Sequence, residues 1–402
     1  MLTKTAAPGL SDLPPVRSDS LLALIALANA DSRPEKIDVG VGVYRDGEGR
    51  TPVLRAVKEA ERRLFEEQQT KAYLGGAGDK VFPELLKPIV LGPHARDERI
   101  AGLQTPGGCG AIYLAMQLIR TAHPQARVFV GAPTWPNHPP MIRGARLEIV
   151  EYPHMDRDTG EVRFDALLER LGDARPGDVV LLHGCCHNPT GADLSSLQWD
   201  QVAQVIAERG LLPLIDIAYQ GLGRGLEEDC YGVRAILDAC EEALIAQSCD
   251  KNFGVYRDRV GCLFVKTRSA EATATAFAHL LQLAREAWSM PPDHGAAAVR
   301  KVLEDEALTA DWKAELEEMR QRIAMVRERI AASDERLAFV ADQYGMFSML
   351  PLTKEQVVGL REKHAIYMAD SGRINVVGIA DEAIDRFCAA VVEALNGLAA
   401  HG

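Results

Sequence analysis

A lysine, a hydroxyl and a guanidinium occur close together near the middle of the chain. Ser248 lies three residues before Lys251, Arg259 lies eight residues after it, and an apolar run over 243–246 leads into this segment. A lysine at the end of a buried strand is desolvated, which lowers its pKa and makes its amine nucleophilic. Arginine binds phosphate through two parallel hydrogen bonds and always carries its charge. An enzyme that uses pyridoxal phosphate requires this combination, whereas Lys251 taken alone is equally compatible with a surface lysine near a turn.

Short apolar runs alternate with longer amphipathic segments, which predicts an α/β fold around a mostly parallel sheet. Ser195 and Gln198 form a capping-box pattern that begins one of the helices, and Gly210 ends it. A long charged helix with one apolar stripe is predicted over 312–332. The predicted buried strands are 128–130, 179–182, 211–215, 244–246 and 262–265.

These patterns divide the chain into an arm and two domains. We expect an N-terminal arm over residues 1–12, rich in proline and serine towards its end. A large domain over 48–312 contains the alternating strands and helices. A smaller α+β domain is formed by the C-terminal residues 313–402, and the long helix leads into it.

Two segments at the ends of predicted strands have the residues to bind a phosphorylated aromatic ligand, because ligands of open α/β sheets bind at the carboxyl ends of strands. The glycine turn over 105–110 precedes an apolar helix predicted over 111–120, and such a turn can hold a phosphate. It lacks the third glycine of the dinucleotide pattern, and an ordinary turn is the alternative. Trp135 follows the strand over 128–130, where it can stack on a ligand ring or pack in the core.

Two further strand ends offer an amide and a carboxylate. His and Cys are clustered over 183–191, which suggests zinc. However, the adjacent Cys185 and Cys186 rarely both bind one ion, and no second cysteine pair has metal spacing, so no metal is predicted. Asn188 begins a rigid turn that presents its amide. Asp216 ends the run over 211–215 and needs a cationic partner, such as a protonated pyridine nitrogen, unless it caps a helix.

The composition excludes several functional classes. The chain has 402 residues and 47% hydrophobic content, enough for a large core. A net charge of -12 argues against a nucleic-acid partner, and no apolar stretch approaches the roughly 20 residues of a membrane span. The first residues lack the apolar core of a signal peptide. Eight scattered cysteines in a chain of this size indicate reduced thiols and a cytoplasmic location.

From about residue 12 to the C-terminus, the chain resembles the class I (fold type I) pyridoxal-phosphate-dependent aminotransferases, in the aspartate/aromatic-amino-acid subgroup. The resemblance implies a large domain with a mixed, mainly parallel sheet flanked by helices, and a smaller α+β domain formed by 13–47 together with 313–402. The matching motifs, in chain order, are GVGVYRD (40–46), TPVL (51–54), YLG (73–75), the glycine turn, WPNH (135–138), CCHNPTG (185–191), DIAY (216–219), Ser248 with Lys251 and Asn252, RVG (259–261), Arg285 before SMPP (289–292), and SGRINV (371–376).

The resemblance implies a role for each matched residue. Lys251 corresponds to the lysine that binds the cofactor covalently and moves the substrate proton. Asp216 corresponds to the partner of the pyridine nitrogen, with His138 supporting it. Trp135 would stack on the ring. Asn188 and Tyr219 would bind the ring oxygen. The residues that would bind the phosphate are Gly108, Cys109, Ser248, Arg259 and the partner subunit's Tyr73.

The substrate would be bound at its carboxylates. Arg373 would bind the α-carboxylate, helped by Gly42, Asn188 and Trp135. Arg285 would come from the partner subunit and bind a side-chain carboxylate, so the resemblance implies a homodimer with shared sites.

Departures from the family pattern bear on the substrate. Cys109 replaces the hydroxyl residue of the phosphate loop, which weakens one donor. Ala72 and Met290 stand where aspartate-specific members have asparagines, which favours aromatic rings. Arg285 is retained, and Val43 and Thr51 match the aspartate enzymes. The mixture predicts dual specificity that leans towards aromatic substrates.

The expected activity is transamination of tyrosine, phenylalanine, tryptophan or aspartate with 2-oxoglutarate, in a ping-pong cycle through the pyridoxamine form of the cofactor. The alternatives are an aspartate-specific aminotransferase, a β-lyase or decarboxylase on the same scaffold, and a non-catalytic regulator. A nicotinamide oxidoreductase would need a third loop glycine and an acidic residue on the next strand.

Overall fold

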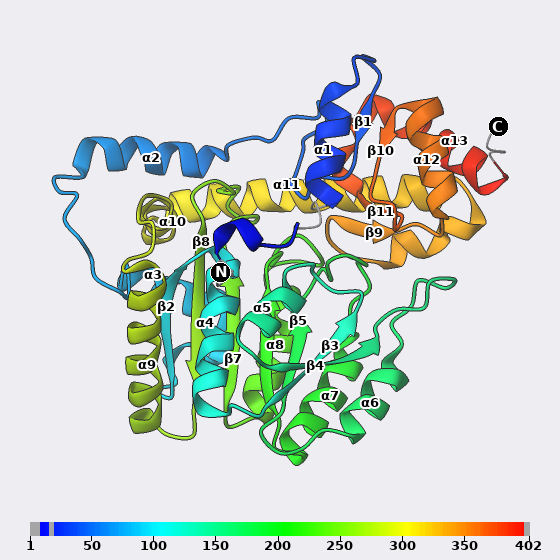
Figure 1. Ribbon diagram of the computed structural model, residues 1–402. Coiled ribbons are helices and arrows are strands. Elements are labelled where there is room, and N and C mark those ends of the chain that lie inside the picture. Colours follow the sequence, from blue (N-terminus) through cyan, green and yellow to red (C-terminus); the bar gives the residue numbers. More distant parts are fainter. Residues whose placement is uncertain (1–8, 16–19, 398–402) are drawn as a thin grey trace, which may run out of the picture.

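The computed structural model describes residues 9–15 and 20–397 (Figure 1). Residues 1–8 of the predicted arm and residues 398–402 of the predicted small domain lie outside the described residues. Within the described ranges, none of the helices is both long and apolar enough to cross a lipid bilayer.

A seven-stranded sheet forms the centre of the larger part of the molecule, in the order β2-β8-β7-β6-β5-β3-β4. Only β8 runs antiparallel to its neighbours, so the predicted mainly parallel sheet is confirmed. The strands are β2 (Ile100–Pro106), β3 (Arg127–Ala132), β4 (Glu148–Pro153), β5 (Val179–His183), β6 (Leu212–Ile217), β7 (Ala243–Ser248) and β8 (Val260–Lys266).

Helices cover both faces of this sheet, because successive strand residues point to opposite sides. On β5, Val180 packs into one apolar core and Leu181 into the other. Helices α4 and α9 pack on the side of Leu181, whereas α3, α7 and α8 pack on the side of Val180. The helices of this part are α2 (Arg55–Glu67), α3 (Val81–Leu91), α4 (Gly107–Ala122), α5 (His138–Gly144), α6 (Phe164–Gly172), α7 (Ser196–Glu208), α8 (Tyr231–Ala239), α9 (Ala270–Trp288) and α10 (His294–Glu304).

Local capping explains where two predicted helices begin. The predicted capping box of α7 is present, since Gln198 N donates to Ser195 Oγ and Ser195 N donates to the Gln198 side chain. The long helix α11 spans Glu306–Ala331, so the predicted start at residue 312 is wrong. Asp305 caps it by accepting the amides of Ala307 and Leu308. Its predicted apolar stripe is buried: Leu316, Met319, Ile323, Val326 and Ile330.

Helices and strands from both the first and the last hundred residues of the chain form the smaller part, at the upper right of Figure 1. There β1 pairs in parallel with β10, and β9 pairs antiparallel with β11. This arrangement agrees with a small domain built from two segments that are distant in the sequence. The exact domain boundaries remain a prediction. Helix α11 runs across the boundary that was predicted between residues 312 and 313. The elements are α1 (Ser20–Ala30), β1 (Ile37–Asp38), β9 (Phe347–Met349), α12 (Lys354–His364), β10 (Ile366–Tyr367), β11 (Arg373–Asn375) and α13 (Ile384–Leu395).

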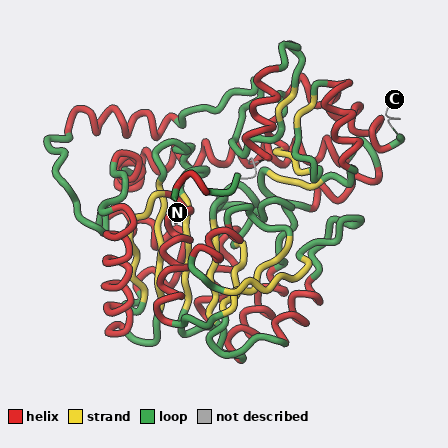
Figure 2. Tube along the Cα trace, in the orientation of Figure 1, coloured by secondary structure: helices red, strands yellow, loops and turns green. Residues whose placement is uncertain are grey.

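Loops gather between the sheet and α11, above the carboxyl ends of the parallel strands (Figure 2). The described chain also contains short 3₁₀ turns: η1 (Leu10–Asp12), η2 (Gly92–Arg96), η3 (Glu228–Cys230), η4 (Glu335–Asp342), η5 (Val376–Gly378) and η6 (Asp381–Ala383).

Candidate active site

A cavity at the carboxyl ends of β5, β6 and β7 brings together most of the predicted site residues. A larger groove of about 690 Å³ lies at the opposite edge of the sheet, between the end of α4 and the start of α9, and is mainly apolar. The smaller cavity contains the reactive groups. It is lined by Gly108, Cys109, Trp135, His183, Asn188, Asp216, Ala218, Tyr219, Ser248, Asp250, Lys251 and Arg259.

The N-terminus of α4 forms one end of this cavity. Helix α4 begins at Gly107, so the predicted start at residue 111 is wrong, and the glycine turn is itself the first turn of the helix. A Cβ on Gly108 would lie 2.9 Å from the Cβ of Ser248, so only glycine allows this close approach to β7. The first amides of a helix lack acceptors within the helix, and the helix dipole favours an anion there. This end of the cavity is therefore suited to a phosphate.

Arg259 adds a positive charge at the same end. Its guanidinium donates to the buried carboxylate of Asp250 and, at 3.0 Å, to the carbonyl of Tyr256. Asp250 also accepts the amide of Val260 at 2.8 Å. Asp250 was not among the predicted site residues; the available signal was an acidic residue directly before Lys251 in a buried segment. Burial raises the pKa of the Cys109 thiol, which therefore contributes at most a weak neutral donor.

Lys251 follows β7 and faces the middle of the cavity. Burial lowers the pKa of its amine, although the carboxylates of Asp250 and Asp216 oppose this effect. Its Nζ lies 5.2 Å from the centre of the Tyr219 ring. A lysine with a lowered pKa has a larger fraction of neutral, nucleophilic amine at neutral pH.

Asp216 lies within β6, so the alternative that it caps a helix is wrong. Burial alone would raise the pKa of its carboxyl, but hydrogen bonding by His138 lowers it, so that the group is ionised. His138 Nε2 donates to Asp216 Oδ2 at 2.9 Å. Thr134 Oγ1 lies 2.7 Å from His138 Nδ1 and 3.1 Å from His183 Nε2, which extends the network. Thr134 and His183 were missed as site residues, because residue type and spacing alone do not indicate this link.

Asn188 and Tyr219 line the cavity beside Lys251. Asn188 Nδ2 donates to the Tyr219 hydroxyl at 3.3 Å, and burial raises the pKa of that hydroxyl. Asn188 is only 6% exposed, and its Oδ1 has no partner among the described residues. A buried amide oxygen without a partner is costly, so a polar ligand at this position would stabilise the site.

Arg373 lies near Tyr219, on the small-domain side. Its guanidinium donates to the Gly40 carbonyl at 2.8 Å and lies 4.6 Å from the centre of the Phe347 ring. The edge of Phe347 meets Tyr219, with ring centres 5.9 Å apart. A Cβ on Gly42 would lie 2.9 Å from the Phe347 ring, so this approach requires glycine. Burial lowers the pKa of Arg373 only from a very high value, and the group stays cationic.

Four predicted site residues are not among those that line the cavity of this chain: Gly42 and Arg373 on the small-domain side, and Tyr73 and Arg285. Tyr73 is 92% exposed, and Arg285 is exposed on α9. Trp135 does line it, half-buried, with its ring edge-on to His138 at 5.2 Å.

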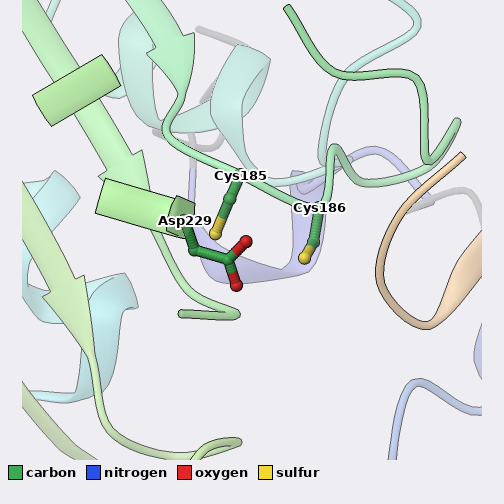
Figure 3. Close-up of side chains that lie close together, drawn as sticks. All are labelled: Cys185, Cys186 and Asp229. Carbon is green, nitrogen blue, oxygen red and sulfur yellow. The ribbon is translucent and has the colours of Figure 1, made fainter. Parts of the chain in front are cut away.

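Cys185, Cys186 and Asp229 form a buried cluster whose ligand atoms lie within 4.8 Å of one another (Figure 3). The Asp229 carboxylate already accepts the amides of Gly221, Gly223 and Arg224. The hydrogen bond with Cys186 and burial raise the pKa of the Cys185 thiol, and burial raises that of Cys186, whereas a metal ion would require thiolates. The cluster therefore reads as interior packing.

The residues of the cavity fit pyridoxal phosphate. The helix N-terminus and Arg259 suit its phosphate, the ionised Asp216 suits a protonated ring nitrogen, and the unpartnered amide oxygen of Asn188 calls for a polar ligand.

Comparison with known proteins gives the same result. The family model "Aminotransferase class I and II" matches residues 34–391. A tyrosine aminotransferase of Rhizobium meliloti (strain 1021) is 50% identical over 365 residues, which cover 90% of this chain and 94% of the relative. An aspartate aminotransferase of Escherichia coli (strain K12) is 42% identical over 387 residues, covering 94% and 98% of the two chains.

A solved structure agrees in fold as well. The aromatic-amino-acid aminotransferase of Burkholderia pseudomallei, described as covalently bound to pyridoxal phosphate, matches with a TM-score of 0.93 and 38% identity. The match covers 96% of this chain and 99% of that one. The predicted family, fold and cofactor are thus confirmed: the chain belongs to the class I and II aminotransferases and is a pyridoxal-phosphate-dependent transaminase of fold type I.

Proposed function

We propose that this transaminase exchanges the amino group of aromatic L-amino acids and of aspartate with 2-oxoglutarate. The observation that carries the proposal is the position of Arg373, which packs on the ring of Phe347, while that ring in turn meets Tyr219 of the cofactor cavity. A guanidinium there suits a substrate α-carboxylate, because arginine binds carboxylates through two parallel hydrogen bonds. Relatives named for tyrosine and for aspartate both support a mixed specificity.

The proposed roles follow from the geometry. Pyridoxal phosphate, when bound, supplies an electron sink that makes the substrate α-proton acidic. Lys251 Nζ is the attachment point and the base that moves this proton, which its lowered pKa favours. Asp216 would keep the ring nitrogen protonated, Asn188 and Tyr219 would bind the ring oxygen, and Trp135 would stack on the ring.

The remaining roles concern the two ends of the site. The phosphate would be bound by the first turn of α4, with Gly108 and Cys109, and by Ser248 and Arg259, which all line the cavity. At the other end, Gly42 allows the close approach of the Phe347 ring on which Arg373 packs, and Arg373 would bind the α-carboxylate.

We also propose that the protein is a cytoplasmic homodimer with shared active sites. Tyr73 and Arg285 are exposed and lie outside the cavity of their own chain, which suits residues that complete the site of a partner subunit. Leu74 N lies 3.1 Å from Met290 Sδ, so the segment that carries Tyr73 contacts the one that follows Arg285. All eight cysteines are free, as expected in a reducing compartment.

The first test mixes the cofactor-loaded protein with phenylalanine, tyrosine or aspartate in the absence of any oxo acid. Conversion of the lysine-bound cofactor absorbance to that of the pyridoxamine form is expected with all three, fastest with the aromatic acids. Conversion by aspartate alone would replace the proposal by an aspartate-specific enzyme. Release of ammonia or carbon dioxide without the pyridoxamine form would indicate a β-lyase or a decarboxylase.

Arg285→Leu tests the distal carboxylate site and the shared dimer site together. We expect kcat/KM for aspartate and 2-oxoglutarate to fall by roughly 30-fold or more, because a charge-assisted bond contributes about 2 kcal/mol. Phenylalanine should be affected far less. Equal losses for all substrates would show that Arg285 does not contact the distal carboxylate.

A further inference from the structure

A buried guanidinium on α11 is bound by main-chain carbonyl groups. Arg327 is only 2% exposed. It donates to the carbonyls of Val340 at 3.1 Å, Tyr344 at 3.0 Å and Gly345 at 2.8 Å, and also to that of Phe347. Within the described residues, every hydrogen bond of this side chain goes to a carbonyl of the 340–347 segment.

Burying this cation without a carboxylate partner is costly. Burial lowers the pKa of Arg327 to about 10, so the group is still charged at neutral pH. Its carbonyl bonds must offset the lost hydration, and they do so only while the segment over 340–347 keeps its conformation. The guanidinium therefore fixes the backbone that leads into β9.

The fixed segment ends at the ring that supports Arg373. Phe347 is the first residue of β9, and the Arg373 guanidinium lies 4.6 Å from its ring centre. Because the Phe347 carbonyl accepts from Arg327 while its ring contacts Arg373, a shift of this residue would move the proposed carboxylate site. The ring has little freedom, since Gly42 packs against one edge and Tyr219 lies beside it.

Arg327 also contacts the turn that carries Asn188. Gly191 ends this turn in a left-handed conformation with φ of 74°. A Cβ on Gly191 would lie 2.9 Å from Arg327 Nη2 and would clash with the carbonyl of Phe347. The Gly191 carbonyl accepts the amide of Tyr344 at 2.8 Å. Arg327 thus lies where the ring-oxygen turn of the large sheet meets the segment that bears Phe347.

We propose that Arg327 is a positioning residue for substrate binding: by holding the 340–347 segment against the Asn188 turn, it sets Phe347 under Arg373 and so orients the guanidinium that receives the α-carboxylate. The inference rests on the proposed role of Arg373. It leaves the phosphate end independent of Arg327, because α4 and β7 form that end.

The test measures binding of 3-phenylpropionate, an aromatic monocarboxylate, to the cofactor-loaded protein. Arg327→Met should weaken binding roughly tenfold or more, equivalent to about 1.4 kcal/mol of lost orientation. Arg327→Lys should recover part of the loss, since it keeps the charge but donates from one atom. The dissociation constant of pyridoxal phosphate should stay within about twofold of the parent value, and KM for the amino acid should rise more than kcat falls.

Lys266→Met is the matched control. Lys266 is 5% exposed and donates to the carbonyls of Leu237 and Cys240 at the far edge of the sheet. Its loss should lower the melting temperature without changing the affinity for 3-phenylpropionate. A comparable loss of affinity in Lys266→Met would mean that general destabilisation explains the Arg327 variants, and would overturn the inference.

Arg373→Leu separates failure of the inference from failure of the proposed function. If Arg373→Leu binds 3-phenylpropionate normally, the carboxylate site itself is misassigned. If Arg373→Leu loses binding while both Arg327 variants bind like the parent, the inference about Arg327 is wrong. If Arg327→Met does not fold, Arg327→Lys alone decides the question: severalfold weaker binding supports the inference, and unchanged binding overturns it.

Discussion

His154→Phe is expected to change how the stability of this protein depends on pH. The His154 ring stacks on that of His187, with centres 3.7 Å apart, and His183 follows at 4.1 Å from His187. Burial lowers the pKa of His154 to about 4 and that of His183 to about 3. The three neighbouring histidine rings connect through His183 to the hydrogen-bond network of Thr134, His138 and Asp216 at the cofactor cavity.

The magnitude follows from linkage between protonation and folding. An unfolded histidine has a pKa of about 6.5, so near pH 7.5 the ring is mostly neutral in both states. Near pH 5, the unfolded chain binds a proton at His154 that the folded protein, with a pKa of about 4, does not. The free energy of unfolding therefore falls with decreasing pH, by about 2 kcal/mol at pH 5 from His154 alone. Since the folded pKa is depressed, the full stability is present above about pH 6.5 and is lost towards pH 4.

The assay is urea unfolding of the parent and of His154→Phe near pH 7.5 and near pH 5, at one protein and cofactor concentration. Near pH 7.5 the variant should be less stable by about 1–2 kcal/mol, because the Ala192 carbonyl loses its bond from His154 Nε2. Near pH 5 the difference should vanish or reverse. A parallel loss of stability in both proteins would refute the reasoning. His279→Phe, at an exposed position on α9, should leave the pH dependence unchanged.

Three further predictions concern the cofactor cavity. Lys251→Ala should lose the visible absorbance of the bound cofactor and nearly all turnover; an active, yellow variant would contradict the assignment of the lysine. Asp216→Ala should bind pyridoxal phosphate more weakly and turn over much more slowly, because the ring nitrogen loses its counter-ion; an unchanged rate would mean that another group faces the nitrogen. Cys109→Ser should tighten cofactor binding by severalfold in a direct titration, because a hydroxyl is a better donor than a thiol by roughly 1 kcal/mol. An unchanged dissociation constant would show that this side chain does not contact the phosphate.

The sequence predicted the sheet and the cavity best where a buried strand ends in a polar residue. Strands β6 and β7 are nearly continuous apolar runs, and each leads directly to a functional group, Asp216 and Lys251. Parallel strands bring their carboxyl ends to one edge, so the local pattern was enough to place these two groups together. The fold class followed from the same alternation of strands and helices.

Two strands of the seven-stranded sheet were not predicted and two predicted helix starts were wrong, and each of these has a local reason. Strand β2 contains a glycine and a glutamine, and β4 lies at the sheet edge with five of its six residues exposed or partly exposed, so neither shows a continuous apolar run. Helix α4 starts inside the glycine turn because Gly108 must approach Ser248 closely. The start of α11 depends on the cap by Asp305.

Contacts between residues that are apart in the sequence could not be predicted from residue type. The bond between Asp250 and Arg259, the link from Thr134 to His183, and the carbonyl bonds of Arg327 all depend on how loops pack. An arginine within a long charged helix looks like a solvated side chain, and nothing in its spacing indicates that it is buried.

The two ends of the site are built from different parts of the fold, and this has a functional consequence. The phosphate end depends on α4, β7 and the Asp250–Arg259 pair, which all belong to the seven-stranded sheet and its connections. The carboxylate end depends on β9 and β11, which belong to a separate two-stranded sheet. A change that displaces β9 relative to the large sheet should therefore weaken substrate binding while cofactor binding is retained. The contacts of Arg327 with the segment before β9, and of that segment with Gly191, are the connection through which such a displacement would act.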